Sequence, residues 1–352
     1  MFQELLVTLS ADIYTVRSII KTNDKLRDIA FGEGPIRKQD FKEYTKLFIA
    51  LFQNIPNPKE WRVYAHCSVV TRLYAIYEHF VENLVSDWLG LLPGLFSHYS
   101  DLEERVRTTH QIGVGRLLLE LKKNRYEHLS PEEVVRGLFR GVTGEEEYEL
   151  LPNAFLLHEQ NLRKETLEKL FADAGIPNAW AWVDKHRAVK NFVEEVRGSQ
   201  NTAEGELNEL ISYRNDAAHK APIDNFLGSS ALLELCDFVE SLCQALTELV
   251  TYQVIERKKL IGQAREIGQI TEWFHKPKAA VVTVEEITLS VGSSLFLVGE
   301  GSSCCQLATI KSIQMNDNAV DKLQTTTEVE VGLKFDVDAR KGLRLYILLE
   351  AG

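Results

Sequence analysis

The chain has 352 residues, of which 45% are hydrophobic and 26% are charged, and its formal net charge is −11. This length allows two or three domains with a sizeable core, and the composition excludes wholesale disorder. The acidic balance argues against broad non-specific binding to nucleic acid, but it is compatible with a local basic patch. The sequence contains no run of about 18 apolar residues, which a membrane span requires, and no secretory signal at its start. We therefore expect a cytoplasmic protein.

The five cysteines do not form a recognisable metal motif. No CxxC pair occurs, so a structural zinc site is not predicted. No other metal or cofactor is expected either. Cys304 and Cys305 are adjacent, and we interpret them as structural residues of a strand or its turn rather than as a redox pair.

Residues 1–58 predict an N-terminal helical layer. Apolar residues recur at helical spacing over 1–30, a Gly-Pro segment ends that helix, and a second helix is predicted over 41–52. The pattern favours a layer that packs on the next domain, with a partner-binding arm as the alternative.

A second, helical domain is predicted over 59–276. Its first helix, over 60–92, has apolar residues three and four positions apart, and Glu78 and Glu82 interrupt that stripe one turn apart. From the pattern alone, both are interpreted as part of a solvated face. Shorter helices are predicted over 101–109, 113–124 and 131–139. The segment 105–125 holds the best basic cluster of this domain, which is interpreted first as a solvated face and second as an RNA contact: Arg105, Arg107, Arg116, Lys122, Lys123 and Arg125.

The segment 213–219 combines the side chains that chemistry on a phosphodiester needs. It ends a helix predicted over 203–220 and contains Arg214, Asn215, Asp216 and His219. Arginine can hold two phosphate oxygens at once, and histidine transfers protons near neutral pH. The two alanines before the histidine keep the helix slim, so a second helix could approach.

The spacing of arginine and histidine is not specific, because Arg105 and His110 have the same spacing and Arg72 and His79 have a slightly wider one. Five residues displace Arg214 and His219 by about 140° around an ideal helix. One helix face therefore cannot present both groups to one phosphate. Unwinding near His219, or a second copy of the helix, would bring them together.

With Asn215 after Arg214 and small residues before His219, the segment resembles the HEPN ribonuclease superfamily, whose signature is Arg-Asn followed by His at a helix end. Segments 77–81 and 157–163 are similar to parts of its RiboL-PSP-HEPN branch, and the resemblance covers about residues 60–255. It implies a homodimer with a shared cleft. It also implies metal-independent RNA cleavage, in which the 2′-hydroxyl attacks its own 3′ phosphate and leaves a 2′,3′-cyclic phosphate.

The resemblance implies a role for each residue of the motif. Arg214 clamps the phosphate, His219 is general acid or base, Asn215 orients the backbone or substrate, and Asp216 or Glu78 orients the histidine. The family is common in toxin–antitoxin and antiviral defence systems, so an antitoxin or another partner protein is expected. Two rival functions remain: an inactive HEPN-like module that binds RNA or protein, and a regulatory subunit that docks through its C-terminal domain.

A long apolar helix is predicted over 230–262 and a linker over 275–278, after which the composition changes. Short β-rich runs separated by turns predict a small antiparallel barrel over 279–352. The barrel resembles the second domain of translational GTPases, although no phosphate-binding GxxxxGK loop occurs. By that analogy the substrate is tRNA or another structured RNA, contacted through Arg340, Lys341 and Lys334. The expected fold is mainly α: a HEPN-like helical bundle followed by a barrel.

Overall fold

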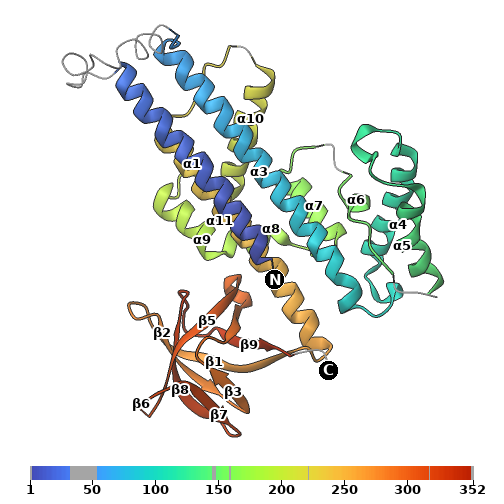
Figure 1. Cartoon of the computed structure of the whole chain (residues 1–352), viewed down its shortest axis with the longest axis vertical. Helices are drawn as coiled ribbons and strands as arrows, with labels where there is room; N and C mark the ends of the chain where they lie inside the picture. Colours follow the sequence, from blue (N-terminus) through green and yellow to red (C-terminus); the bar gives the residue numbers. More distant parts are fainter. Residues whose placement is uncertain are drawn as a thin grey trace, which may run out of the picture.

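The computed structural model describes residues 2–31, 54–144, 148–157, 160–220, 222–316 and 318–349. Long helices form the upper part of the molecule and a small barrel lies at one end of them (Figure 1). The expected fold class, a mainly helical chain followed by an antiparallel barrel, is confirmed. Within the described ranges, none of the helices combines the length and the hydropathy that crossing a bilayer would need.

Three long helices lie side by side and form the helical core. They are α1 (Gln3–Phe31), α3 (Pro58–Leu95) and α11 (Ser229–Leu260). The helix expected over 1–30 is therefore present as α1, and it packs on the next unit with one buried stripe: Leu9, Ile13, Val16 and Ile20. The helix expected over 41–52 lies outside the described residues.

Helix α3 is longer than its sequence pattern indicates. Its start is capped by Asn57, whose Oδ1 accepts the amide of Glu60 at 3.0 Å. The sequence predicts a break at 92–94, but the helix continues through Pro93 to Leu95. A proline this close to the end removes only one hydrogen bond of the final turns, so the helix need not stop before it.

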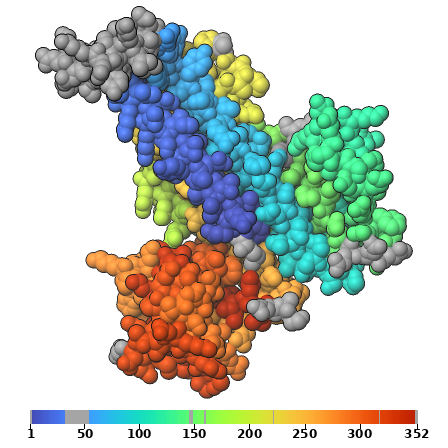
Figure 2. Space-filling model, viewed as in Figure 1, coloured from blue at the N-terminus to red at the C-terminus, as the bar shows by residue number. Residues whose placement is uncertain are grey.

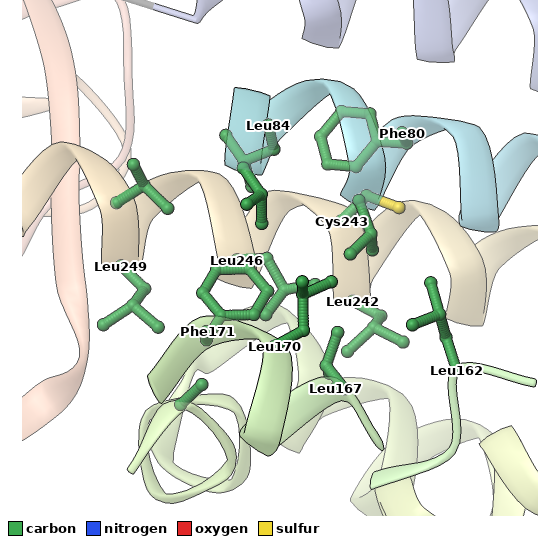
Figure 3. Packing of buried hydrophobic residues seen from close by; sticks show 14 of the residues in the cluster. Phe80, Leu84, Leu162, Leu167, Leu170, Phe171, Leu242, Cys243, Leu246 and Leu249 are labelled. Atoms are coloured by element: carbon green, nitrogen blue, oxygen red, sulfur yellow. The ribbon is translucent and has the colours of Figure 1, made fainter. Parts of the chain in front are cut away.

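A series of shorter helices lies between α3 and α11 in the sequence, and several of them pack against these two helices. The shorter helices are η2 (Tyr99–Asp101), α4 (Glu104–Glu120), η3 (Asn124–Tyr126), α5 (Pro131–Thr143), α6 (Pro152–Phe155), α7 (Lys164–Asp173), α8 (Ala179–Lys185), α9 (Arg187–Asn191), η4 (Phe192–Val196) and α10 (Ala203–His219). Figure 3 shows apolar side chains of α3, α7 and α11 meeting in the shared core.

The sequence predicts two separate helices over 101–109 and 113–124, but one continuous helix, α4, takes their place. It runs unbroken through Gly113, where the backbone of α6 comes so close that a Cβ would lie 2.0 Å from the Ala154 oxygen. Packing against α6 thus offsets the low helix propensity of glycine. The start of α5 is capped by Ser130, whose Oγ accepts the amide of Glu133 at 3.2 Å.

The C-terminal strands form a closed antiparallel barrel in the order β4-β9-β1-β2-β8-β5, with β5 pairing back to β4. The strands are β1 (Ala264–Phe274), β2 (Ala279–Val284), β3 (Ile287–Ser290), β4 (Ser294–Gly299), β5 (Cys304–Met315), β6 (Asn318–Val320), β7 (Lys322–Thr325), β8 (Val329–Phe335) and β9 (Arg344–Leu348). The prediction of a linker over 275–278 is wrong, because these residues form the turn between β1 and β2. The barrel therefore begins at Ala264 rather than at residue 279.

The barrel is fixed to the helices by a buried polar contact. Glu248 of α11 is 7% exposed, and it accepts the Cys305 amide at 2.9 Å and contacts His186 Nε2 at 3.3 Å. Burial alone would raise the pKa of Glu248, but His186 and these hydrogen bonds outweigh it, so the pKa is lowered. Several barrel side chains also belong to the helical core: Phe296, Val298, Cys305 and Tyr346. The two units meet closely in Figure 2.

Candidate active site

Helix α10 carries the Arg-Asn…His segment and stays helical to its last residue. Its first turn is capped by Thr202, whose Oγ1 accepts the Gly205 amide at 3.0 Å, and it packs on α3. At the other end, the Lys220 amide bonds to the Asp216 carbonyl at 2.9 Å. Of the two ways in which Arg214 and His219 could approach each other, unwinding is therefore not what this structure has.

Arg214 is half-buried and held on several sides. Its guanidinium lies over the ring of Tyr74 on α3, 4.8 Å from the centroid. Its Nη1 donates to Asn215 Oδ1 at 3.0 Å and to Asn161 Oδ1 at 3.3 Å. All these partners are neutral, so they orient the guanidinium without cancelling its charge.

The residues that hold Arg214 are themselves fixed. Asn161 Nδ2 donates to Asn215 Oδ1 at 3.1 Å. The Tyr74 hydroxyl accepts the Leu162 amide at 3.1 Å and donates to Glu78 at 2.9 Å. Burial raises the pKa of Tyr74 well above its usual value, which keeps the hydroxyl protonated as a donor. The loop before α7 is thus attached to α3, and it presents Asn161 to the arginine.

Sequence analysis assigned no role to Tyr74 or Asn161. One signal was available for Tyr74, since it lies one helical turn before Glu78 and the two share a face of α3. For Asn161 no local signal exists, because only the tertiary fold brings this loop to α10.

The two carboxylates expected to orient the histidine have other partners. Glu78 accepts from Tyr74, and Asp216 forms an ion pair with Lys220 at 2.8 Å. In one chain, neither of them contacts His219 among the described residues. The physical reason is the helix geometry: His219 is exposed at the end of α10, whereas Arg214 packs against α3. One chain therefore separates arginine and histidine, as their spacing indicates.

The geometry agrees with a comparison against known families. The family model described as RiboL-PSP-HEPN matches residues 37–252, which is more than half of the chain. The chain belongs to the RiboL-PSP-HEPN family. The matched range includes Tyr74, Asn161 and the whole of α10, and it ends before the barrel. No curated protein matches the sequence.

The other two arginine–histidine pairs in this RiboL-PSP-HEPN chain have different surroundings. His110 is fully buried, and it accepts the Leu151 amide at 3.3 Å. Burial lowers the pKa of His110 to about 4. Its partner in the spacing, Arg105, is an exposed residue that pairs with Asp173 at 2.8 Å. Arg72 pairs with Asp12 at 3.1 Å, on the side of α3 that faces α1.

The three basic residues predicted to contact RNA are not all together. Arg340 and Lys341 line one pocket between the barrel and α11, whereas Lys334 lies outside it on β8. Among the residues that the structure describes, no three His, Cys, Asp or Glu side chains gather as a metal site would require.

Proposed function

We propose that this RiboL-PSP-HEPN protein is a metal-independent endoribonuclease. The observation that carries the proposal is the Arg214 guanidinium, held half-exposed by three neutral partners on a helix whose last residue is an exposed histidine. A fixed positive charge that pairs with no carboxylate of the described residues is suited to stabilising the charge that develops on phosphate oxygens. An exposed imidazole is suited to moving protons near neutral pH.

The reaction proposed is an internal transesterification. The ribose 2′-hydroxyl gives its proton to a base, and its oxygen bonds to the adjacent phosphorus. The bond from phosphorus to the 5′ oxygen breaks, and that oxygen takes a proton from an acid. The products are a 2′,3′-cyclic phosphate end and a 5′-hydroxyl end. His219 supplies one of the two proton transfers, Arg214 holds the phosphate oxygens, and Asn215 keeps the guanidinium in place.

We propose further that the active form is a homodimer. His219 lies five residues beyond Arg214 on an intact helix, so a second copy of α10 offers the simplest way to place an arginine and a histidine on one phosphate. In that arrangement Arg214 of one subunit acts with His219 of the other. In that arrangement Asp216 or Glu78 is proposed to orient the histidine of the other subunit.

A subunit-mixing experiment tests both proposals. The Arg214→Ala and His219→Ala variants are each expected to be inactive. When the two are unfolded together and refolded as a mixture, heterodimers contain one complete site, and part of the wild-type activity should return. If cleavage needs both groups from one chain, the mixture stays inactive. A monomer by light scattering with full activity would also contradict the dimer.

The product and the metal requirement give a second, independent test. Cleavage should persist in EDTA and leave a 2′,3′-cyclic phosphate, and a 2′-deoxyribose at the cut position should block it. The Arg72→Ala variant, which changes an exposed arginine on the α1 side of α3, serves as the matched control and should cut normally. Efficient cleavage of the deoxy substrate would contradict the proposed mechanism.

The finer assignments are also proposals. We infer that the enzyme acts in a toxin–antitoxin or antiviral defence system, with an antitoxin or similar partner, and cuts tRNA or another structured RNA. The barrel is proposed to select the RNA through Arg340, Lys341 and Lys334. Because barrel residues share the helical core, point substitutions are a better test than removing the barrel. Cleavage maps on total RNA should change when these three residues are substituted. Unchanged maps would assign the barrel another role.

A further inference from the structure

A pocket of about 560 Å³ lies where the end of α11 meets the barrel. One wall is the last turns of α11, and the opposite wall is formed by two barrel segments, 298–302 and 340–346. This seam pocket is built jointly by the family-matched helices and by the barrel, and it lies apart from the Arg214 cluster. None of its residues belongs to the Arg214 cluster. Arg340 and Lys341 are two of the residues proposed above to contact RNA, so an RNA-end ligand at this pocket rests on the proposed function.

The charged residues of the seam pocket are mostly cationic. Four cations line it, Lys259, Arg340, Lys341 and Arg344, against two carboxylates, Glu256 and Glu300, which leaves a net charge of +2. The whole chain, by contrast, has a net charge of −11. An isolated positive pocket on an acidic protein attracts anions to that place and repels them elsewhere.

Two of the four cations have no counter-ion within the described part of the chain. Lys259 lies 3.5 Å from Glu256, and Arg344 lies 3.7 Å from Glu266 just outside the pocket. Arg340 and Lys341 form no ion pair with any residue that the structure describes. They are adjacent and exposed at the mouth of the pocket, so a ligand could neutralise both at little desolvation cost.

The segment that carries these two cations is fastened to the helices. Asp338, two residues before Arg340, pairs with Arg187 of α9 at 2.8 Å, and its carbonyl accepts from Gln306 at 2.6 Å. On the other side, Tyr346 is 1% exposed and packs in the helical core. The pocket is therefore preorganised rather than assembled from loose loops, which lowers the entropy lost on binding.

We propose that the seam pocket binds a phosphomonoester, that is, the terminal phosphate of a nucleotide or of an RNA end. Such a group carries a charge of about −1.5 to −2 near pH 7, which matches the balance of the lining residues. An internal phosphodiester carries one charge and continues as an extended strand in both directions, which a compact pocket does not follow. Arginine and lysine are the side chains that best bind phosphate oxygens.

Matched adenosine compounds test the proposal by calorimetry on the full-length protein. Adenosine, AMP and cyclic AMP share one base and differ in carrying no phosphate, a monoester or a diester. AMP is expected to bind at least tenfold more tightly than the other two. The Arg340→Ala, Lys341→Ala double variant should lose that difference. The Lys276→Ala, Lys322→Ala double variant, which removes two exposed barrel lysines outside the pocket, should keep it.

The source of the phosphate is decided with oligoribonucleotides, using the His219→Ala variant so that no cleavage occurs. A 5′-phosphorylated oligomer that binds at least tenfold more tightly than AMP identifies an RNA end, and equal affinity identifies a free nucleotide. The proposal is overturned if AMP and cyclic AMP bind equally, if the two double variants lose equal affinity, or if no phosphorylated ligand binds. These outcomes do not depend on whether the protein cleaves RNA.

Discussion

Two segments of this chain have the same spacing of arginine and histidine, and their environments are opposite. In α4, His110 is fully buried and Arg105 is exposed and paired with a carboxylate. In α10, His219 is exposed and Arg214 is half-buried among neutral partners. The first pair has a histidine that cannot readily take up a proton and an arginine whose charge is already compensated. In the second pair the imidazole is exposed and the guanidinium has neutral neighbours.

The cause of this difference is the packing around each helix. Helix α4 is covered by α6, and His110 stacks on Phe155 with ring centroids 5.9 Å apart, so its ring is part of the core. The end of α10 has no such cover in the described part of the chain. Spacing in the sequence therefore selects candidates, and burial decides which of them can do chemistry. The following predictions test that distinction, from the largest expected effect to the smallest.

The largest effect is expected on cleavage. Arg214→Ala and His219→Ala should each lower the cleavage rate by about 10³-fold, in the range for loss of a charge-stabilising group or a proton-transfer group. Arg105→Ala should change the rate by less than about twofold, because its charge serves an ion pair on the surface. Single-turnover cleavage of a labelled RNA measures all three. Equal losses in the α4 and α10 variants would mean that the environments do not distinguish the pairs.

The free energy of unfolding should show the reverse order, with the larger loss for the substitution in α4. His110→Ala removes a fully buried ring with a hydrogen bond to a backbone amide, which should lower the free energy of unfolding by about 2–4 kcal/mol. His219→Ala should change it by less than about 0.5 kcal/mol, as is usual for an exposed side chain. Urea unfolding followed by circular dichroism compares the two variants. A larger loss for His219→Ala would contradict the burial that distinguishes them.

The pH dependence of stability should follow the buried histidine. Burial lowers the pKa of His110 from 6.5 to about 4, so between these values the unfolded chain binds a proton that the folded chain does not. The contribution is therefore a loss of stability as the pH falls from about 6.5 towards 4. The His110→Asn variant should show a shallower loss over this window than the wild type. Parallel curves for the two proteins would be the contrary result.

The smallest effect concerns the support of Arg214. Asn161→Ala removes a hydrogen bond to the guanidinium and the bond to Asn215, so the arginine should lose its fixed position without losing its charge. We expect about a tenfold lower kcat with little change in KM, since orientation matters most in the transition state. Asn83→Ala, which changes a half-buried amide on α3, is the control. A change in KM only would assign Asn161 to substrate binding instead.

The amino-acid sequence by itself determined the main elements of this protein. Periodic apolar residues specify α1, α3, α10 and α11, because a helix of that length forms wherever one face can be buried. The cap before α5 follows from local hydrogen bonding between Ser130 and Glu133. The Arg-Asn…His segment, together with segments 77–81 and 157–163, indicated the family. These features depend on neighbours within a few residues, so they can be read in order along the chain.

Only the tertiary structure decided which polar residues are accessible and which are buried and already hydrogen-bonded. Leu162 and Asn161 contact α3 and α10, although they are far from these helices in the sequence. The Leu151 amide likewise bonds to His110, which is far from it in the sequence. Strand β1 follows a helix and has a weak alternation of its own, so its place in the barrel is fixed by pairing with β2 and β9. Strand pairing and side-chain burial depend on partners that a local pattern does not contain, which is the physical reason why they could not be predicted from it.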